Sequence, residues 1–153
     1  MPACISTRDL KNQLNPAVSG FFYGNEYRIF YERTSDLELA RIFLSDRIER
    51  RESIIFVACN DNSECCGFTQ LFPSFSSVAV KGVWILNDLY VEKTARKKGI
   101  GRVLMNKARE FAVETESRGI VLETAKSNTN AQALYESLGY EKNTEYFYSL
   151  NLE

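Results

Sequence analysis

The hydrophobic pattern in the second half of the chain predicts a strand, then a helix, then another strand. Residues 83–91 are mostly apolar on both faces, as expected for a central strand, and Asn87 and Asp88 interrupt this run with polar side chains. Residues 100–112 place apolar side chains at steps of three and four, which is typical of an amphipathic helix. Residues 120–124 begin with three apolar residues and predict another buried strand.

The turn between this first strand and the helix carries two glycines and three cations. Its residues are Arg96, Lys97, Lys98, Gly99, Ile100 and Gly101. Glycine lets backbone N–H groups turn toward an anion, and the positive end of the following helix favours negative charge. The turn therefore predicts a diphosphate site at a helix N-terminus. We expect Gly119 to close the helix.

The first half of the chain predicts two helices followed by two strands. Residues 6–22 predict a helix, and residues 35–51 predict a second helix with a broad apolar face. Residues 53–58 and 65–72 predict strands, joined by a polar turn at residues 60–63. The broad apolar face of the second helix consists of Leu37, Ala40, Ile42, Phe43, Leu44 and Ile48. Strands and helices in this order predict a mixed sheet.

Other phosphate-binding loops fit the glycine turn less well. A Walker loop requires Lys followed by Ser or Thr after its last glycine, whereas Arg102 and Val103 stand there. A dinucleotide-binding fingerprint requires a third glycine where Leu104 stands, although Glu123 lies at about the position of the ribose-binding acid. A protein kinase is excluded because the chain has no His and no catalytic-loop motif.

Two motifs resemble signatures of the GNAT superfamily of acyl-CoA-dependent N-acetyltransferases. Residues 96–101 are similar to the family's loop, which has Arg or Gln, two variable residues, Gly, one variable residue, and Gly or Ala. The second motif consists of Asn128, Ala131, Leu134, Tyr135, Leu138, Gly139 and Tyr140. Together the motifs cover roughly residues 83–150, and residues 53–58 and 67–77 are similar to a bacterial branch of the family.

The resemblance implies the fold of one N-acetyltransferase domain over residues 1–153. Such a fold is of the α/β class (α+β, mixed), with a twisted mixed sheet that is mostly antiparallel, a central splayed strand pair, and flanking helices. It also implies acetyl-CoA, whose pantetheine arm would pair with backbone groups of the strand at residues 83–91. A backbone N–H there, pointing at the thioester oxygen, would stabilise the oxyanion by about 3 kcal/mol.

The residues that the resemblance assigns to the cofactor lie on the strand, on the glycine turn and at the start of a later helix. They are Leu89, Tyr90, Val91, Arg96, Lys97, Lys98, Gly99, Ile100, Gly101, Arg102 and Asn128. Asn128 is also a good N-cap residue, so helix capping stays open as its role.

The resemblance also assigns the acid, whereas the base is argued from the residues. Tyr135 corresponds to a family tyrosine near the thioester sulfur, and a phenol can protonate a leaving thiolate. Without His, the base must be a carboxylate, a tyrosine or a water chain. Asp88 leads because burial in an apolar strand makes a carboxylate more basic, and Glu123 is the second candidate. A purely structural, hydrogen-bonding role for Asp88 stays open, and Asn87 could hold a water.

The acceptor site of relatives is bordered by segments that are rich in aromatic residues in this chain. These residues are Tyr23, Tyr27, Tyr31, Phe72, Phe75 and Tyr146, and each could instead serve packing. We expect direct transfer of an acetyl group from acetyl-CoA to the primary amine of a small molecule, without a covalent enzyme intermediate. Two alternatives stay open: a CoA-binding regulatory module without transferase activity, and a protein or peptide N-acetyltransferase.

Composition adds mainly exclusions. The chain has 153 residues, 44% of them hydrophobic, and a net charge of −1, which suits one domain and argues against a nucleic-acid binder. No apolar run is long enough for a membrane span, and no signal-peptide pattern opens the chain, so we expect a cytoplasmic protein. The four cysteines lack metal-ligand spacing, so we expect reduced structural thiols and no metal. The expected partners are a small-molecule amine and, in a homodimer, a second copy of the chain.

Overall fold

The computed structural model describes residues 8–9 and 37–152. The chain divides into two compact units, residues 1–123 and residues 124–153, and each is described by itself. Of the helix expected over residues 6–22, the structure describes only Arg8–Asp9, and these residues form the strand β1 instead of a helix, so this part of the prediction is wrong. The rest of that range lies outside the described residues. No helix of the described residues is long and apolar enough to cross a membrane.

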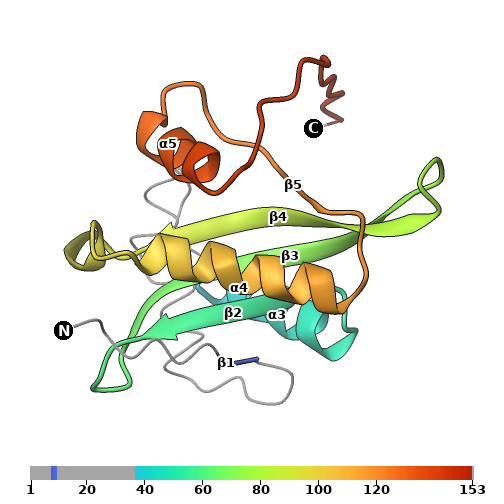
Figure 1. Cartoon of the computed structure of the whole chain (residues 1–153). Helices are drawn as coiled ribbons and strands as arrows, with labels where there is room; N and C mark the ends of the chain where they lie inside the picture. Colours follow the sequence, from blue (N-terminus) through green and yellow to red (C-terminus); the bar gives the residue numbers. More distant parts are fainter. Residues whose placement is uncertain (1–7, 10–36, 153) are drawn as a thin grey trace. The chain divides into compact units, whose positions relative to one another are not determined.

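The first unit is built on a five-stranded sheet in the order β1-β2-β3-β4-β5 (Figure 1). All neighbouring strands are antiparallel except β4 and β5, which run parallel. The expected mixed, mostly antiparallel sheet is therefore confirmed. The strands are β1 (Arg8–Asp9), β2 (Ile54–Cys59), β3 (Cys65–Ser76), β4 (Lys81–Val91) and β5 (Ile120–Leu122).

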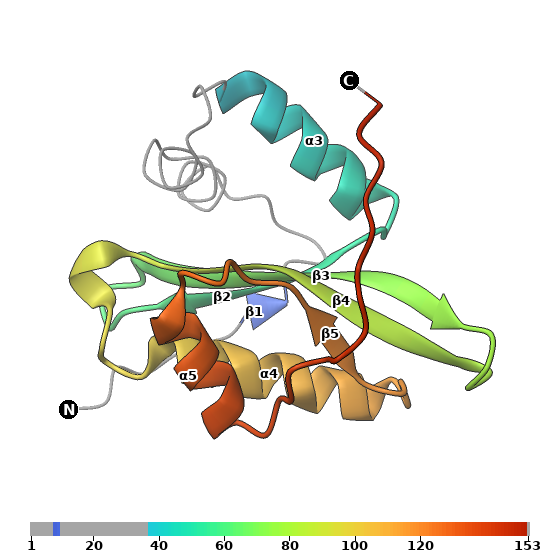
Figure 2. The ribbon, with the colours of Figure 1, turned by 90° about the horizontal axis from the view of Figure 1, so that it is seen from above.

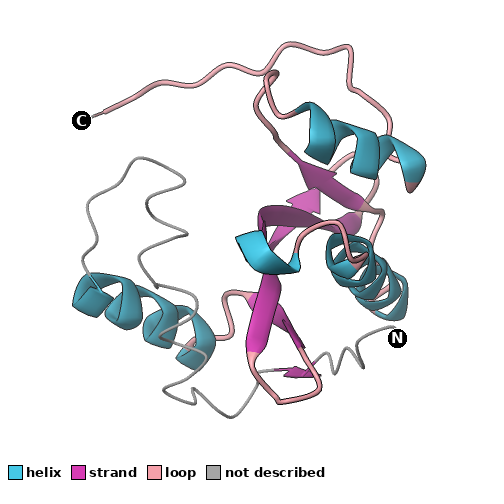
Figure 3. Cartoon of the chain, turned by 90° about the vertical axis from the view of Figure 1, so that its left-hand side faces the viewer, coloured by secondary structure: helices cyan, strands magenta, loops and turns pink. Residues whose placement is uncertain are grey.

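Two helices cover opposite faces of this sheet, as Figures 2 and 3 show: α3 (Leu37–Glu49) on one face and α4 (Ile100–Glu114) on the other. On the α3 face, Leu44 packs in a buried cluster with Ile55, Val57, Phe68 and Tyr90. Side chains one strand position apart point to opposite faces, so the neighbours of these strand residues serve the α4 face. The buried residues of α4 are Ile100, Leu104, Met105, Ala108 and Ala112.

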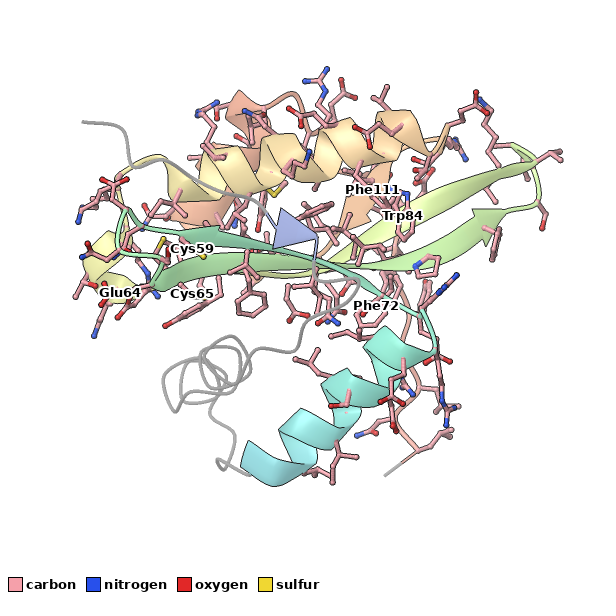
Figure 4. All side chains as sticks on the ribbon, turned by 90° about the horizontal axis from the view of Figure 1, so that it is seen from below. Cys59, Glu64, Cys65, Phe72, Trp84 and Phe111 are labelled. Carbon is pink, nitrogen blue, oxygen red and sulfur yellow. The ribbon has the colours of Figure 1, made fainter. Side chains whose placement is uncertain are left out.

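Aromatic rings fix the far end of α4 on the sheet. The ring centroid of Phe111 lies 5.0 Å from that of Trp84 and 5.6 Å from that of Phe56. The indole Nε1 of Trp84 donates to Thr115 Oγ1 over 2.8 Å, so the polar edge of the ring is also satisfied. Figure 4 shows Trp84 and Phe111 on the α4 side of the sheet and Phe72 on the α3 side.

Two further details of the helix predictions are wrong. Of the expected apolar face of α3, Leu44 is buried and Ile48 packs against the same cluster, but Ile42 and Phe43 are about half exposed, so these described side chains pack over a narrower face than the sequence pattern. Helix α4 ends at Glu114 rather than at Gly119. Thr115 Oγ1 donates to the Phe111 carbonyl, which satisfies one of the last carbonyls of the helix without a glycine.

The second unit contains α5 (Thr129–Ser137). Gly139 closes it with a φ of +87°, a left-handed conformation that glycine adopts without strain. Its N–H donates to the carbonyl of Glu136, and the next N–H, of Tyr140, donates to that of Tyr135. The Leu-Gly-Tyr part of the second motif is therefore the C-terminal cap of α5.

Candidate active site

The start of α4 is a helix N-terminus without a side-chain cap. Its N-cap residue, Gly99, has a φ of +83°, and Lys97 also adopts a left-handed conformation, with a φ of +61°. A non-glycine residue in this region is uncommon and strained, and such strain gathers at binding sites. A side-chain Cβ on Gly99 would meet nothing within 4 Å, so backbone conformation rather than space requires glycine here.

The charges around the start of α4 favour an anion. The first N–H groups of a helix lack intrahelical acceptors, and the helix dipole adds partial positive charge there. Carboxylates usually complement that charge, but the first turn of α4 has none. It has cations instead, with Arg102 inside the turn and Lys97 and Lys98 exposed before it. In α5, by contrast, Asn128 caps the helix, since its Oδ1 accepts from the Ala131 N–H over 3.3 Å.

Arg96 ties this turn to the end of β4. Its Nε atom donates to the Val91 carbonyl over 2.9 Å, and its guanidinium lies 5.9 Å from the centroid of the Tyr90 ring. Arg96 therefore both adds positive charge and fixes the turn on the strand. The Tyr90 side chain itself is buried in the core of the α3 face, and Ile100, the first residue of α4, is also buried.

One edge of β4 continues past its last pair with β5. In the described residues, β5 pairs with β4 only from Trp84 to Leu86. Further along, the Glu92 N–H donates to the Cys66 carbonyl on β3 over 2.9 Å. Backbone groups alternate along a strand, so Leu89 and Val91 direct their N–H and C=O groups away from β3. The expected splayed pair corresponds to this edge.

A β-bulge marks the point where β4 and β5 separate. Gln70 pairs with Asp88 and Leu71 with Leu86, so Asn87 is the extra residue. Bulges re-aim side chains and are common near active sites. The polar interruption that the sequence showed is therefore a bulge, and Glu123 follows β5 one residue beyond its last paired position.

The structure brings the two proposed bases to the same region of the sheet. Asp88 is half-buried, and its Oδ2 accepts from the Asn87 Nδ2 over 3.0 Å. Glu123 is exposed. Leu86 pairs with Leu122 in parallel strands, so Glu123, the next residue after Leu122, lies level with Asn87 at the bulge. Asn87 thus contacts the leading candidate directly, which fits a role in orienting it.

The aromatic residues expected around the acceptor differ from one another in location and exposure. Phe72 is half-buried and shares its face of β3 with Gln70, the register partner of Asp88. Phe75 is 85% exposed near the far end of β3, away from Asp88. Tyr146, in the second unit, is 88% exposed. The other three expected residues, Tyr23, Tyr27 and Tyr31, lie outside the described residues.

Tyr135 belongs to the second unit. It is half-buried in the last turn of α5, and its ring centroid lies 6.1 Å from that of Tyr140. Upstream, the Gln132 Nε2 donates to the carbonyls of Ala125 and Lys126, which fixes the segment that leads into the helix. The second motif thus builds a short helix, capped at both ends, that carries a tyrosine.

Three buried polar residues near the bulge were not singled out by the sequence analysis. Thr69 Oγ1 donates to the Asp88 carbonyl over 2.9 Å, and Gln70 Nε2 donates to Ser53 Oγ over 3.1 Å. Buried polar side chains are normally hydrogen-bonded, and these follow that rule. The signal that could have found Thr69 and Gln70 is their place as a polar pair inside the otherwise apolar stretch of residues 66–72.

The described cysteines are free thiols. The Sγ atoms of Cys59 and Cys65 lie 3.9 Å apart across the β2–β3 hairpin (Figure 4), and Cys66 donates to the Ala58 carbonyl. Burial raises the pKa of the Cys66 thiol above its ordinary value of 9.0, with a smaller contribution from Cys59. In the part of the chain that the structure describes, no group of three or more potential ligands could hold a metal ion.

Comparison with known proteins now decides the family. The profile of the "Acetyltransferase (GNAT) family" matches residues 21–140. The chain belongs to the GNAT acetyltransferase family. A Bacillus subtilis (strain 168) protein named "Uncharacterized N-acetyltransferase YhfO" is 42% identical over 149 residues, which is 97% of this chain and 98% of that protein.

Two further relatives agree. A "Probable acetyltransferase" of Haemophilus influenzae (strain ATCC 51907 / DSM 11121 / KW20 / Rd) is 33% identical over 117 residues, covering 76% of this chain and 78% of the relative. A solved structure described as a probable acetyltransferase superposes with a TM-score of 0.87 at 36% identity, covering 97% of each chain. The expected GNAT fold and the expected N-acetyltransferase enzyme are therefore confirmed.

Proposed function

We propose that this GNAT enzyme transfers an acetyl group from acetyl-CoA directly to the primary amine of a small molecule. The proposal rests on two neighbouring features. First, the helix α4 starts without a side-chain cap and among cations. Second, the preceding strand, β4, turns backbone groups of Leu89 and Val91 away from its neighbour β3. A diphosphate suits the first feature and a chain of amides suits the second.

The residues present fit acetyl-CoA. The turn from Arg96 to Arg102 would hold the diphosphate with backbone N–H groups and cations, and the edge of β4 would pair with the pantetheine amides. Asn128 uses its Oδ1 to cap α5, so its side-chain NH₂ is the group that we propose for a cofactor contact. When bound, acetyl-CoA supplies a thioester whose carbonyl carbon an amine attacks.

The proposed chemistry needs an oxyanion donor, a base and an acid. The Leu89 N–H, on the edge of β4, would stabilise charge that develops on the acyl oxygen. Asp88 would take the proton of the amine, directly or through a water held by Asn87, with Glu123 as the second candidate. Tyr135 would give a proton to the departing thiolate.

A small amine is the acceptor that the described site favours. Asp88 is half-buried and shares its face with Gln70 and Phe72, so an amine with little bulk around it reaches this carboxylate most easily. We propose Tyr27, Tyr31 and Tyr146 as further acceptor contacts by family resemblance. We also propose one domain over residues 1–153, because the family match at residues 21–140 runs across both units.

A panel of amines tests this function. The enzyme is incubated with acetyl-CoA and one amine at a time, thiol release is followed, and products are identified by mass. The panel includes polyamines, amino acids, aminoglycosides and short peptides with a free N-terminus. Thiol release with an acetylated small amine supports the proposal. Acetylated peptides alone would change the acceptor class, and binding of acetyl-CoA without any transfer would indicate a regulatory module.

A further inference from the structure

The peptide unit between Asp88 and Leu89 is held from one side by a buried hydroxyl. Thr69 Oγ1, on β3, donates to the Asp88 carbonyl oxygen over 2.9 Å, and Thr69 has no exposed surface. Thr69 is the register partner of Leu89. The hydrogen bond therefore links β3 to β4 beside the bulge, next to the register shift between Gln70 and Leu71.

This hydrogen bond also orients an N–H group. A peptide unit is planar and trans, so the carbonyl of one residue and the N–H of the next point in opposite directions. If the Asp88 carbonyl is fixed toward Thr69, the Leu89 N–H is fixed toward the other edge of β4. That edge lies beyond the last pair with β5, Leu86 with Leu122.

We propose that Thr69 is a positioning residue, whose hydroxyl aims the Leu89 N–H at the acyl oxygen of the donor. The inference rests on the proposed acetyl transfer, in which Leu89 provides the oxyanion donor. Thr69 itself touches neither substrate, and it acts through the peptide unit that it holds. Preorganised donors stabilise developing charge because they need no reorientation during the reaction, so a loosened peptide unit lowers turnover.

Two substitutions of Thr69 separate the hydroxyl from the shape of the side chain. Thr69→Val keeps the shape and removes the donor, whereas Thr69→Ser keeps the donor. Ser53→Ala is the matched control, because it also removes a buried hydroxyl hydrogen bond from the same unit, at Gln70. If the Val variant does not fold, Thr69→Cys, whose thiol is only a weak donor, is measured in its place.

The expected result is a split between kcat and KM. Thr69→Val should lower kcat by about tenfold to a hundredfold, less than the loss of a whole donor, with little change in the KM for acetyl-CoA. Thr69→Ser and Ser53→Ala should stay near wild type. In ¹⁵N NMR spectra, the Leu89 amide should shift on addition of acetyl-CoA to the wild type, and this shift should shrink in the Val variant.

Three outcomes would overturn the role of Thr69 while leaving the proposed function intact. They are an active Val variant with wild-type kcat, a Ser variant as impaired as the Val variant, and an equal loss in Ser53→Ala. A wild type that transfers acetyl to no amine overturns the proposed function itself, and the positioning role falls with it. The two failures are therefore distinguishable.

Discussion

The Nε atom of Arg96 donates to the carbonyl oxygen of Val91 over 2.9 Å. This contact joins the cationic turn before α4 to the last residue of β4. The two parts of the proposed donor site, the anion-binding helix start and the amide-binding strand edge, are thus held in one arrangement before any ligand arrives. Preorganisation of this kind reduces the entropy that binding costs.

Gly99 should be required for acetyl-CoA binding because of its left-handed backbone. Gly99→Ala should weaken acetyl-CoA binding about fivefold to thirtyfold, since the left-handed conformation costs other residues about 1 to 2 kcal/mol. Calorimetry measures the affinity. Gly119→Ala is the control, because a Cβ meets open space at both positions but only Gly99 has a positive φ. Equal affinities of both variants would contradict the assignment of the turn.

Tyr135→Phe should lower kcat by about 100-fold to 10,000-fold, because the phenol proton is removed while the ring stays. The affinity for acetyl-CoA should change little. Steady-state kinetics with the best amine, together with calorimetry, give both values. Tyr140→Phe is the matched control, since its ring lies beside that of Tyr135. If Tyr135→Phe turns over at the wild-type rate, water or another group protonates the thiolate.

Asp88→Asn should impair the enzyme most at low pH. At higher pH more of the free amine is already deprotonated, so the variant should recover part of its activity. The measurement is the pH profile of kcat/KM for wild type, Asp88→Asn and Glu123→Gln. If the pH profile of Asp88→Asn is parallel to that of wild type, Asp88 has a structural role. If activity recovers at high pH in Glu123→Gln but not in Asp88→Asn, Glu123 is the base.

Stability should fall at high pH through Cys66. Burial raises the pKa of this thiol in the folded protein, so the folded state keeps a proton that the unfolded state loses above pH 9.0. The contribution of the protonated Cys66 thiol to the free energy of unfolding is full below pH 9.0, and it is lost as pH rises through the raised pKa of the folded state. Urea unfolding of wild type and Cys66→Ala gives the difference at each pH. A difference in unfolding free energy that is constant from pH 8 to pH 11 would refute this.

The parts of the fold that depend on neighbouring residues were predictable from sequence. The apolar run of β4, the periodicity of α4 and the glycine of the turn specify local structure, and all three are confirmed. The end of α4 was not predictable from the sequence. The side chains of Thr115 and Ser117 donate to carbonyls in the last turn of the helix, so the helix ends before Gly119. A glycine signals only one of several ways to end a helix.

Features that depend on pairing between strands were beyond the sequence pattern. The polar residues at positions 87 and 88 were visible, but the bulge is defined by the register with β3. The Thr69–Asp88 contact joins residues 19 positions apart. The exposure of Leu39, Ile42 and Phe43 likewise depends on how much of the sheet α3 covers. Periodicity predicts which face is apolar but not how much of it is buried.

The central claim is direct transfer of an acetyl group from acetyl-CoA to an amine. Its most direct measurement is a quenched reaction of the enzyme with acetyl-CoA and the best amine of the panel, with intact-mass analysis of both the amine and the protein. The account predicts one added acetyl group on the amine, equimolar thiol release, and an unmodified protein at every time point. An acetylated protein that precedes the product, or thiol release without an acetylated amine, would contradict it.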